Sequence, residues 1–146
     1  MHNLTSVKAR PVRFRAWTWE GAEYTIQFDT FQVLDSSTNY KLRLESLNAS
    51  ATSPGIDQQK CRDNFTTNAN QEFTTIDRDN DSRNFGNCAE RFGGAGYWYK
   101  RCTLVSPNVE YCPSSNCGSK FRTVQVTCLK GDSYSMKKFQ IDVLVA

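Results

Sequence analysis

The sequence lacks several features by which common protein classes are recognised. It has one histidine, His2, and no CxxC pair, so a zinc site is not expected. Its 18 basic and 15 acidic residues form no run of one sign, which argues against a nucleic-acid or membrane-surface partner. No apolar run can span a bilayer and no secretory leader begins the chain. We therefore expect a mature piece of a longer protein, without membrane insertion.

Catalytic signatures are also missing. There is no internal histidine, no Gly-x-Ser-x-Gly turn, and no open His/Glu metal site of the hydrolase type. We therefore do not expect an enzyme. The apolar fraction of 38% is low but aromatic residues make up 12%, so the 146 residues predict one domain, 1–146, with a modest core and long ordered loops.

The cysteines and asparagines that are present point to an extracellular chain. An even number of cysteines outside any zinc spacing predicts disulfides. Four N-glycosylation triplets agree with secretion. These triplets begin at Asn3, Asn48, Asn64 and Asn80, and the cysteines are Cys61, Cys88, Cys102, Cys112, Cys117 and Cys128.

Alternating apolar residues predict strands near both ends of the chain. The pattern occurs in residues 10–19, 23–28, 40–47, 123–128 and 138–145, whereas helical periodicity is scarce apart from a short turn at 88–92. The residues expected on the buried faces are Val12, Phe14, Ala16, Tyr24, Ile26, Phe28, Tyr40, Leu42, Leu44, Val124, Val126, Cys128, Phe139, Ile141, Val143 and Val145.

A long loop region extends from about residue 48 to residue 121. It is rich in Asn, Ser, Thr, Gly and Asp and carries five of the six cysteines. A loop this long inside a compact domain is usually functional, and it cannot bury enough apolar surface to offset its own ordering entropy. Disulfides and a metal ion are the available means of holding it.

Three aspartates stand at alternate positions in the stretch FTTIDRDND. Asp77, Asp79 and Asp81 have the spacing of many calcium loops, in which hard oxygen ligands surround the ion. The helical EF-hand is disfavoured, because its glycine at loop position six and glutamate at position twelve are missing. The alternative is a solvated turn in which Asp and Asn cap their own backbone. Spacing alone leaves both interpretations open.

The wider context resembles one family. FTTIDRDND is followed by GNCAE, a glycine run, YWYKRC and, near the carboxyl end, YSMKK, and it is preceded by HNLTS, RPVRFRAW, WEGAEY and TNYKLRLES. In this order the segments resemble the fibrinogen C-terminal (fibrinogen-related) domain over nearly the whole chain. The family's first third, a cysteine-bearing subdomain with a Gly-Gly-Trp motif, has no counterpart here, so the chain corresponds to the middle and C-terminal subdomains. It is either a fragment or a naturally reduced form whose extra cysteines compensate.

The resemblance and the strand pattern together imply an α+β fold. We expect a small twisted antiparallel sheet, few short helices, and a long loop region held by disulfides and Ca²⁺. By the resemblance, the side-chain calcium ligands are Asp79 and Asp81, and Asp77 either supports these ligands from behind or caps the turn. The segment between Asp81 and Cys88 is one residue longer than the family's commonest spacing. The backbone carbonyl ligands fall on Arg83, Asn84 and Phe85.

The resemblance also implies a disulfide between Cys88 and Cys102, beside the ligand pocket. The other four cysteines can pair in three ways, and the sequence does not choose among them. We favour the short Cys112–Cys117 loop together with Cys61–Cys128.

In lectins of this family, an acetyl-binding pocket lies near the second cysteine of that bridge, which a cis peptide bond precedes. The matching bond is Arg101–Cys102, and Thr103 follows where histidine is common. Phe92 falls at the place of an aromatic wall. Tyr99 or Tyr111 is a further candidate wall, although plain packing is the favoured interpretation of these aromatics. The family's tryptophan-bearing pocket loop is replaced by CPSSNCGSKFRTVQVTC, so specificity for acetylated sugars is not assumed.

Two functions from different classes remain. The first is a secreted, calcium-dependent, lectin-like module that binds a glycan or an acetylated group, as in innate immunity. The second is an extracellular domain that binds a protein or receptor, with a purely structural calcium. A homo-oligomer is considered only through upstream regions that this sequence does not contain.

Overall fold

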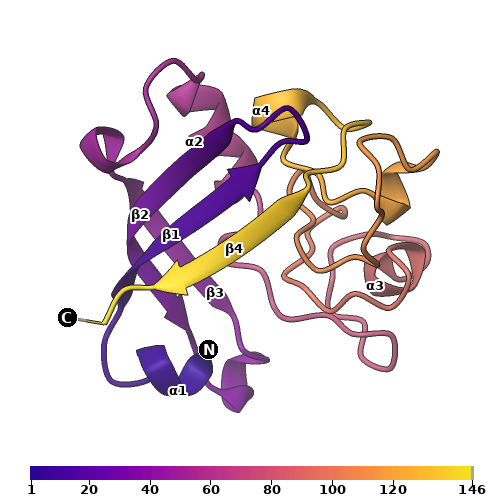
Figure 1. Ribbon diagram of the computed structural model, residues 1–146. Helices are drawn as coiled ribbons and strands as arrows, with labels where there is room; N and C mark the ends of the chain where they lie inside the picture. The colour runs from indigo at the N-terminus through magenta and orange to yellow at the C-terminus, as the bar shows by residue number, and fades with distance from the viewer. Residues whose placement is uncertain (146) are drawn as a thin grey trace.

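The computed structural model describes residues 1–145, and its centre is an antiparallel sheet. Four strands lie in the order β3-β2-β1-β4, and β4, from the end of the chain, pairs with β1, from its beginning (Figure 1). The sheet predicted from the sequence is confirmed. The strands are β1 (Arg10–Trp17), β2 (Glu23–Val33), β3 (Leu42–Leu47) and β4 (Lys138–Val143).

The helices are few and short, as the predicted fold class requires. The longest, α2, has nine residues and is preceded by its N-cap Asp57, whose carboxylate accepts a hydrogen bond from the Lys60 N–H at 3.0 Å. The turn expected at 88–92 is helix α3. The α-helices are α1 (His2–Thr5), α2 (Gln58–Thr66), α3 (Cys88–Arg91) and α4 (Thr127–Lys130), and the 3₁₀ turns are η1 (Ser36–Thr38), η2 (Ala49–Ala51) and η3 (Lys120–Arg122).

One face of the sheet forms the first part of the core. The alternation in β1 buries Val12, Phe14 and Ala16, as predicted, because successive side chains of a strand point to opposite faces. Helix α2 covers this face with Phe65, whose ring centroid lies 4.8 Å from that of Phe14 and 6.1 Å from that of Phe28. The sheet is thus held by apolar contacts on one side.

Three predictions about the strands are wrong. Residues 123–128 do not form a strand: Val126 makes a single bridge to Val105, and helix α4 starts at Thr127. Tyr40 is exposed and precedes β3, with a positive φ of 55° that turns it away from the buried face. Val145 lies beyond the end of β4 and is exposed.

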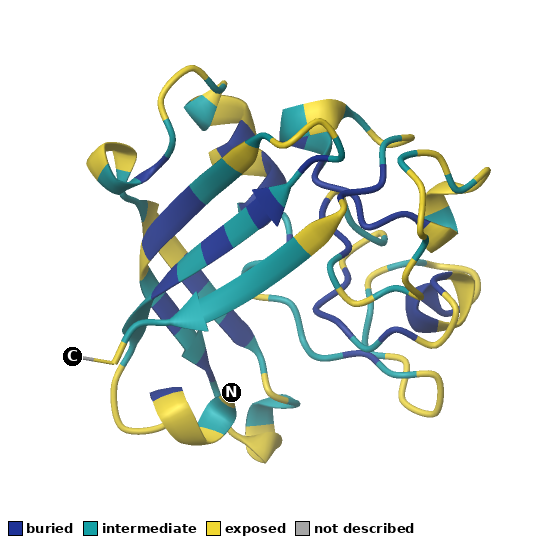
Figure 2. Cartoon of the chain, viewed as in Figure 1, coloured by how far each residue is buried: buried dark blue, intermediate teal, exposed yellow. Residues whose placement is uncertain are grey.

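The loop region forms the second half of the molecule, beside the sheet, and much of its outer surface is exposed (Figures 1 and 2). Trp98 joins the halves: its ring lies edge-on to Phe31 of the sheet at 6.5 Å and to Phe73 at 5.2 Å. Three disulfides hold this half, in the pairing favoured from the sequence. They are Cys61–Cys128, Cys88–Cys102 and Cys112–Cys117.

Within the described part of the chain, no helix has the length and apolarity needed to cross a membrane.

Candidate functional site

The aspartate loop begins with a tight turn. Thr75 and Arg78 exchange two backbone hydrogen bonds, of 3.0 and 3.2 Å, and the Thr75 hydroxyl donates to the Asp77 carboxylate at 2.7 Å. That hydrogen bond lowers the pKa of the Asp77 carboxyl below its ordinary value. Asp77 therefore stabilises the turn in which it lies, which agrees with a capping role.

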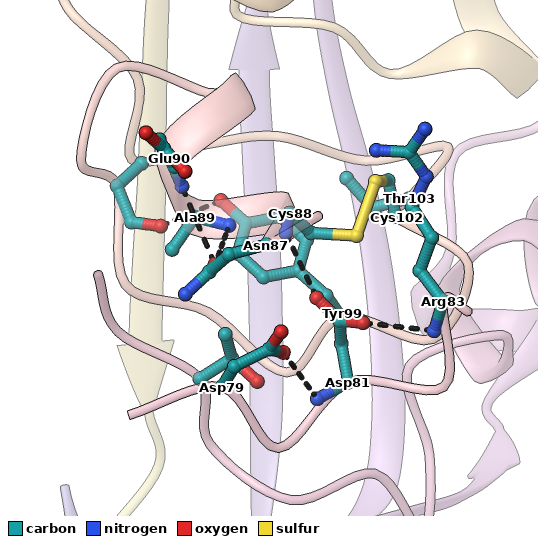
Figure 3. Close-up of a disulfide and its surroundings, with 12 residues drawn as sticks. Asp79, Asp81, Arg83, Asn87, Cys88, Ala89, Glu90, Tyr99, Cys102 and Thr103 are labelled. Atoms are coloured by element: carbon teal, nitrogen blue, oxygen red, sulfur yellow. Dashed lines mark hydrogen bonds between the residues drawn. A yellow bond between two sulfur atoms is a disulfide. The ribbon is translucent and has the colours of Figure 1, made fainter. Parts of the chain in front are cut away.

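Asp81 is the centre of the hydrogen bonds in this loop (Figure 3). Its two carboxylate oxygens accept from the backbone N–H groups of Arg83 and Cys88, each at 2.8 Å. The N–H of Asp81 in turn donates to the Asp79 carboxylate at 3.2 Å. Since Cys88 is bonded to Cys102, one carboxylate ties the aspartate loop to the disulfide.

The electrostatics of this pair oppose its ionisation. Loss of water contact raises the pKa of the Asp81 carboxyl, and the negative charge of Asp79 raises it further. The two backbone N–H donors act in the opposite direction, but the resulting pKa is above the ordinary value. A cation between or beside the two carboxylates removes this repulsion.

The donor set fits a calcium ion. A carboxylate has about four lone-pair sites, so Asp81 can still coordinate a metal after accepting two N–H groups. Among residues 1–145, no group of three or more His, Cys, Asp or Glu side chains gathers as a metal site. The remaining ligands of a calcium ion would therefore be neutral oxygens, such as water and backbone carbonyls of the segment 83–85, in which Asn84 and Phe85 are exposed.

Asn87 is a supporting residue that the sequence analysis did not identify. Its side-chain oxygen caps α3, accepting from the Ala89 N–H at 2.7 Å, and its Nδ2 donates to the carbonyls of Thr75 and Ile76 at 2.8 and 3.2 Å. Figure 3 shows the cap of α3, and the two bonds to Thr75 and Ile76 join the aspartate turn to this helix, which carries Cys88. An asparagine directly before the run CAER is a typical N-cap signal.

The expected aromatic wall lies in the core instead. Phe92 is only 2% exposed; its ring stacks on Tyr99 at 5.5 Å and meets Phe121 edge-on at 5.2 Å. Tyr99 is 1% exposed and its hydroxyl donates to the Ala95 carbonyl at 2.6 Å, while burial raises its pKa. The prediction of Phe92 and Tyr99 as ligand-contacting walls is therefore wrong, because both rings pack within the loop half.

The segment around the second cysteine also differs from the expectation. Within residues 1–145 every peptide bond is trans, so the expected cis Arg101–Cys102 bond is wrong, and Cys102 instead has a positive φ of 68°. The Thr103 hydroxyl lies 2.6 Å from the Val105 carbonyl, to which it donates, and accepts from the Val105 N–H at 3.1 Å. It is engaged inside the protein rather than open to a ligand. Arg101 is exposed.

Two cavities in the loop half lie away from these residues. Tyr111 is 57% exposed and lines a cavity of about 250 Å³ together with Val109 and Met136. A polar cavity of about 460 Å³ lies in the segment between Cys112 and Ser133. Neither includes Phe92, Cys102 or Thr103, so the predicted pocket residues are not brought together. The polar cavity is lined by Asn116, Gly118, Ser119, Lys120, Thr123, Asp132 and Ser133.

Comparison with known proteins gives consistent matches. The family model of the C-terminal globular domain of fibrinogen beta and gamma chains matches residues 1–144. Fibrinogen beta chain of Petromyzon marinus is 31% identical over 119 residues, 76% of this chain, and angiopoietin-4 of Mus musculus is 31% identical over 136 residues, 93% of it. This chain spans 25% of the length of each of these two relatives.

The structural comparison agrees. The fibrinogen-like globe domain of human ANGPTL2 superposes with a TM-score of 0.79 at 29% identity, over 96% of this chain and 60% of that domain chain. The architecture of sheet and stapled loop half is thus shared with a solved relative.

Proposed function

The chain belongs to the family of C-terminal globular domains of fibrinogen beta and gamma chains, and on this basis we propose that it is a secreted extracellular recognition domain stabilised by calcium. Domains of this family bind ligands and are not enzymes, which agrees with the missing catalytic signatures. The relatives include a fibrinogen chain and an angiopoietin, and three disulfides suit an oxidising, extracellular location.

One observation carries the calcium part of this proposal. The Asp81 carboxylate accepts hydrogen bonds from the N–H groups of Arg83 and Cys88, while burial and, to a smaller extent, the neighbouring Asp79 raise its pKa. Asp79 and Asp81 would hold the ion with carbonyls of Arg83–Phe85, and the ion would supply the positive charge that the pair lacks. The loop and the Cys88–Cys102 bridge would then be ordered together.

A protein surface is the partner that the geometry supports best. The residues expected to grip an acetyl group are engaged internally, since Phe92 is buried and the Thr103 hydroxyl is bonded to Val105. Beside the aspartates, by contrast, Ile76 and Phe85 expose large apolar side chains, and Phe85 is 83% exposed. Exposed aromatic side chains are typical anchors of protein–protein contacts.

Glycan binding is a second candidate. It is supported by the polar cavity between Cys112 and Ser133, where Lys120, Asp132 and several hydroxyl groups face a volume of about 460 Å³. A glycan array with and without EDTA separates the two. Retention that is lost in Lys120→Ala but kept in Phe85→Ala would favour the glycan over the protein partner.

The calcium proposal is tested by a reversal of sign. In EDTA, Asp79→Asn removes the like charge beside Asp81, so it should increase the free energy of unfolding by the ~0.2–1 kcal/mol typical of exposed charge pairs. The melting temperature should therefore rise slightly. In calcium it removes a ligand, so the variant should melt below the wild type by mass action. Asp77→Asn is the matched control, because it changes a turn carboxylate outside the proposed ligand set. An Asp79→Asn response that is the same with and without calcium would contradict the proposal.

A further inference from the structure

Four asparagines stand in N-glycosylation triplets, and the fold treats them differently. N-linked glycosylation replaces one hydrogen on the asparagine Nδ2 with a bulky sugar. A folded product therefore needs that nitrogen to face solvent and to have no essential place in the hydrogen bonding of the fold. This requirement can be applied to Asn3, Asn48, Asn64 and Asn80 in turn.

Asn3 meets the requirement. It is exposed, on the short helix α1, and its side chain makes no hydrogen bond to any of residues 1–145; only its backbone carbonyl accepts, from the Ser6 hydroxyl at 3.3 Å. The helix is anchored through Thr5, which is fully buried and whose hydroxyl accepts from the Val33 N–H at 3.0 Å. The residue that completes the triplet thus fixes the helix, while the acceptor asparagine lies on its exposed side.

Asn64 and Asn80 fail for different reasons. Asn64 is 8% exposed in α2, next to Phe65, which packs on Phe14, so a sugar there would force the helix off the sheet. Asn80 uses its Nδ2 to donate to the Phe73 carbonyl at 2.8 Å, and its backbone N–H donates to Thr74. A sugar on Asn80 would disrupt the aspartate loop.

Asn48 is intermediate. It is half-buried, its Nδ2 donates to the Asp29 carboxylate at 3.0 Å, and its Oδ1 accepts from the Ala51 N–H at 3.0 Å as the cap of η2. A sugar on this nitrogen crowds one hydrogen bond at the surface without entering the core. Its occupancy should therefore be lower than that of Asn3.

We propose that Asn3 is the principal N-glycan attachment site of this protein, with less on Asn48 and none on Asn64 or Asn80. The donor is a lipid-linked oligosaccharide of the secretory pathway: the Asn3 Nδ2 bonds to the first sugar carbon, the bond from that carbon to the lipid diphosphate breaks, and the amide gives up one proton. The proposal rests on the proposed secretion. Helix α1 lies at the end of the sheet, away from α3 (Figure 1), so the glycan leaves the aspartate loop uncovered.

The test is secretion of the chain from eukaryotic cells behind a cleavable leader, followed by glycosidase release in heavy-oxygen water and peptide mapping, which marks each formerly occupied asparagine. The wild type should carry the label mainly at Asn3. Asn3→Gln should lose most of the glycosidase-sensitive gel shift, while Asn64→Gln and Asn80→Gln should leave the shift unchanged.

The failures are distinguishable. A secreted chain with bare Asn3, with label on Asn64 or Asn80, or with Asn48 occupied as fully as Asn3 overturns this inference and leaves the proposed function standing. A chain that stays inside the cell although its leader is removed overturns the extracellular location, and with it the inference.

Discussion

The sheet half and the loop half of the molecule are held by different means. In the sheet, four strands pair along their length and bury Val12, Phe14 and Phe28 beneath α2. The loop half has packed rings as well, such as Phe92 on Tyr99, but disulfides and single side chains that bond to backbone, such as Asp81 and Asn87, also hold it. The first kind of stability depends on packing, and the second depends also on redox state, on protonation and, by our proposal, on a calcium ion. A recognition surface on the loop half is therefore adjustable by its surroundings in a way that the sheet is not.

The largest expected effect comes from removing the ring that packs on the sheet. Phe65→Ala should reduce the free energy of unfolding by about 3–5 kcal/mol, because it leaves a cavity against Phe14 and Phe28. Urea denaturation measures it. The matched control is Phe85→Ala, which removes an exposed ring and should change stability by less than about 0.5 kcal/mol. Equal losses in the two variants would show that the core does not depend on this contact.

The next effect concerns the disulfide beside the aspartate loop. Replacing both Cys88 and Cys102 with serine should cost about 3 kcal/mol, from the loop-closure entropy of a sequence separation of 14. Replacing Cys112 and Cys117, separated by 5, should cost only about 2 kcal/mol by the same model.

Hydrogen exchange shows which part of the molecule loses stability when Cys88 and Cys102 are replaced. The amides of the aspartate loop and α3 should exchange faster in the Cys88/Cys102 variant, while those of β1 and β2 keep their protection. Uniformly faster exchange would mean that the two halves unfold as one unit, and the contrast between them would not hold.

A smaller effect should come from the asparagine cap. Asn87→Ala removes the N-cap of α3 and the two hydrogen bonds to Thr75 and Ile76, and should cost about 1–2 kcal/mol. Its control is Asn84→Ala, an exposed position three residues earlier. Thermal unfolding at one calcium concentration compares them. If Asn87→Ala is as stable as Asn84→Ala, the hydrogen bonds of Asn87 do not stabilise the aspartate turn.

The smallest effect is a pH dependence confined to the loop half. Because the native pKa of Asp81 is raised, the native state binds its proton more tightly than the unfolded chain does. The stability that Asp81 contributes is thus fully present below the unfolded pKa, near 3.8, and is lost as pH rises through the native pKa. The test compares melting temperatures in EDTA at a series of pH values. The melting temperature of the wild type minus that of Asp81→Asn should fall as the pH rises from the unfolded pKa of Asp81 through its native pKa. A difference that rises instead would reverse the assigned sign.

The sequence predicts the sheet well because buried and exposed side chains alternate along a strand, and this alternation is visible as alternating apolar and polar residues. In β1 and β3, Val12, Phe14, Leu42 and Leu44 follow that period and are buried. The alternation of Val124 and Val126 looks the same in the sequence, yet these residues are buried by packing in the loop half and gain one bridge only. The period of two in the sequence therefore indicates which side chains are buried, but it does not indicate whether the segment pairs with another strand.

The loop half was less predictable, for physical reasons. Helix α2, QQKCRDNFT, buries only three residues of its nine, so no apolar periodicity marks it, although Asp57 is an N-cap signal. Of the three disulfides, only Cys88–Cys102 followed from the family resemblance, because the sequence left three possible pairings for the other four cysteines. Phe92 was misplaced because the chain turns at the end of α3, where its N–H donates to the Cys88 carbonyl at 3.0 Å, and its ring then packs on Tyr99.

The pairing of β4 with β1 has a consequence for how the chain is made. Val12 lies opposite Val143, and Cys61 is bonded to Cys128 across 67 residues of sequence. Neither contact can form until residues 128–143 have left the ribosome, so one edge of the β1–β2 pair stays unpaired during their translation. Contacts between residues so far apart in the sequence predict slow folding, which can be completed only after residue 143 has been made. Over that interval Cys61 is oxidisable while Cys128 is still unmade, so the correct bridge depends on a disulfide isomerase or on the order in which cysteines emerge.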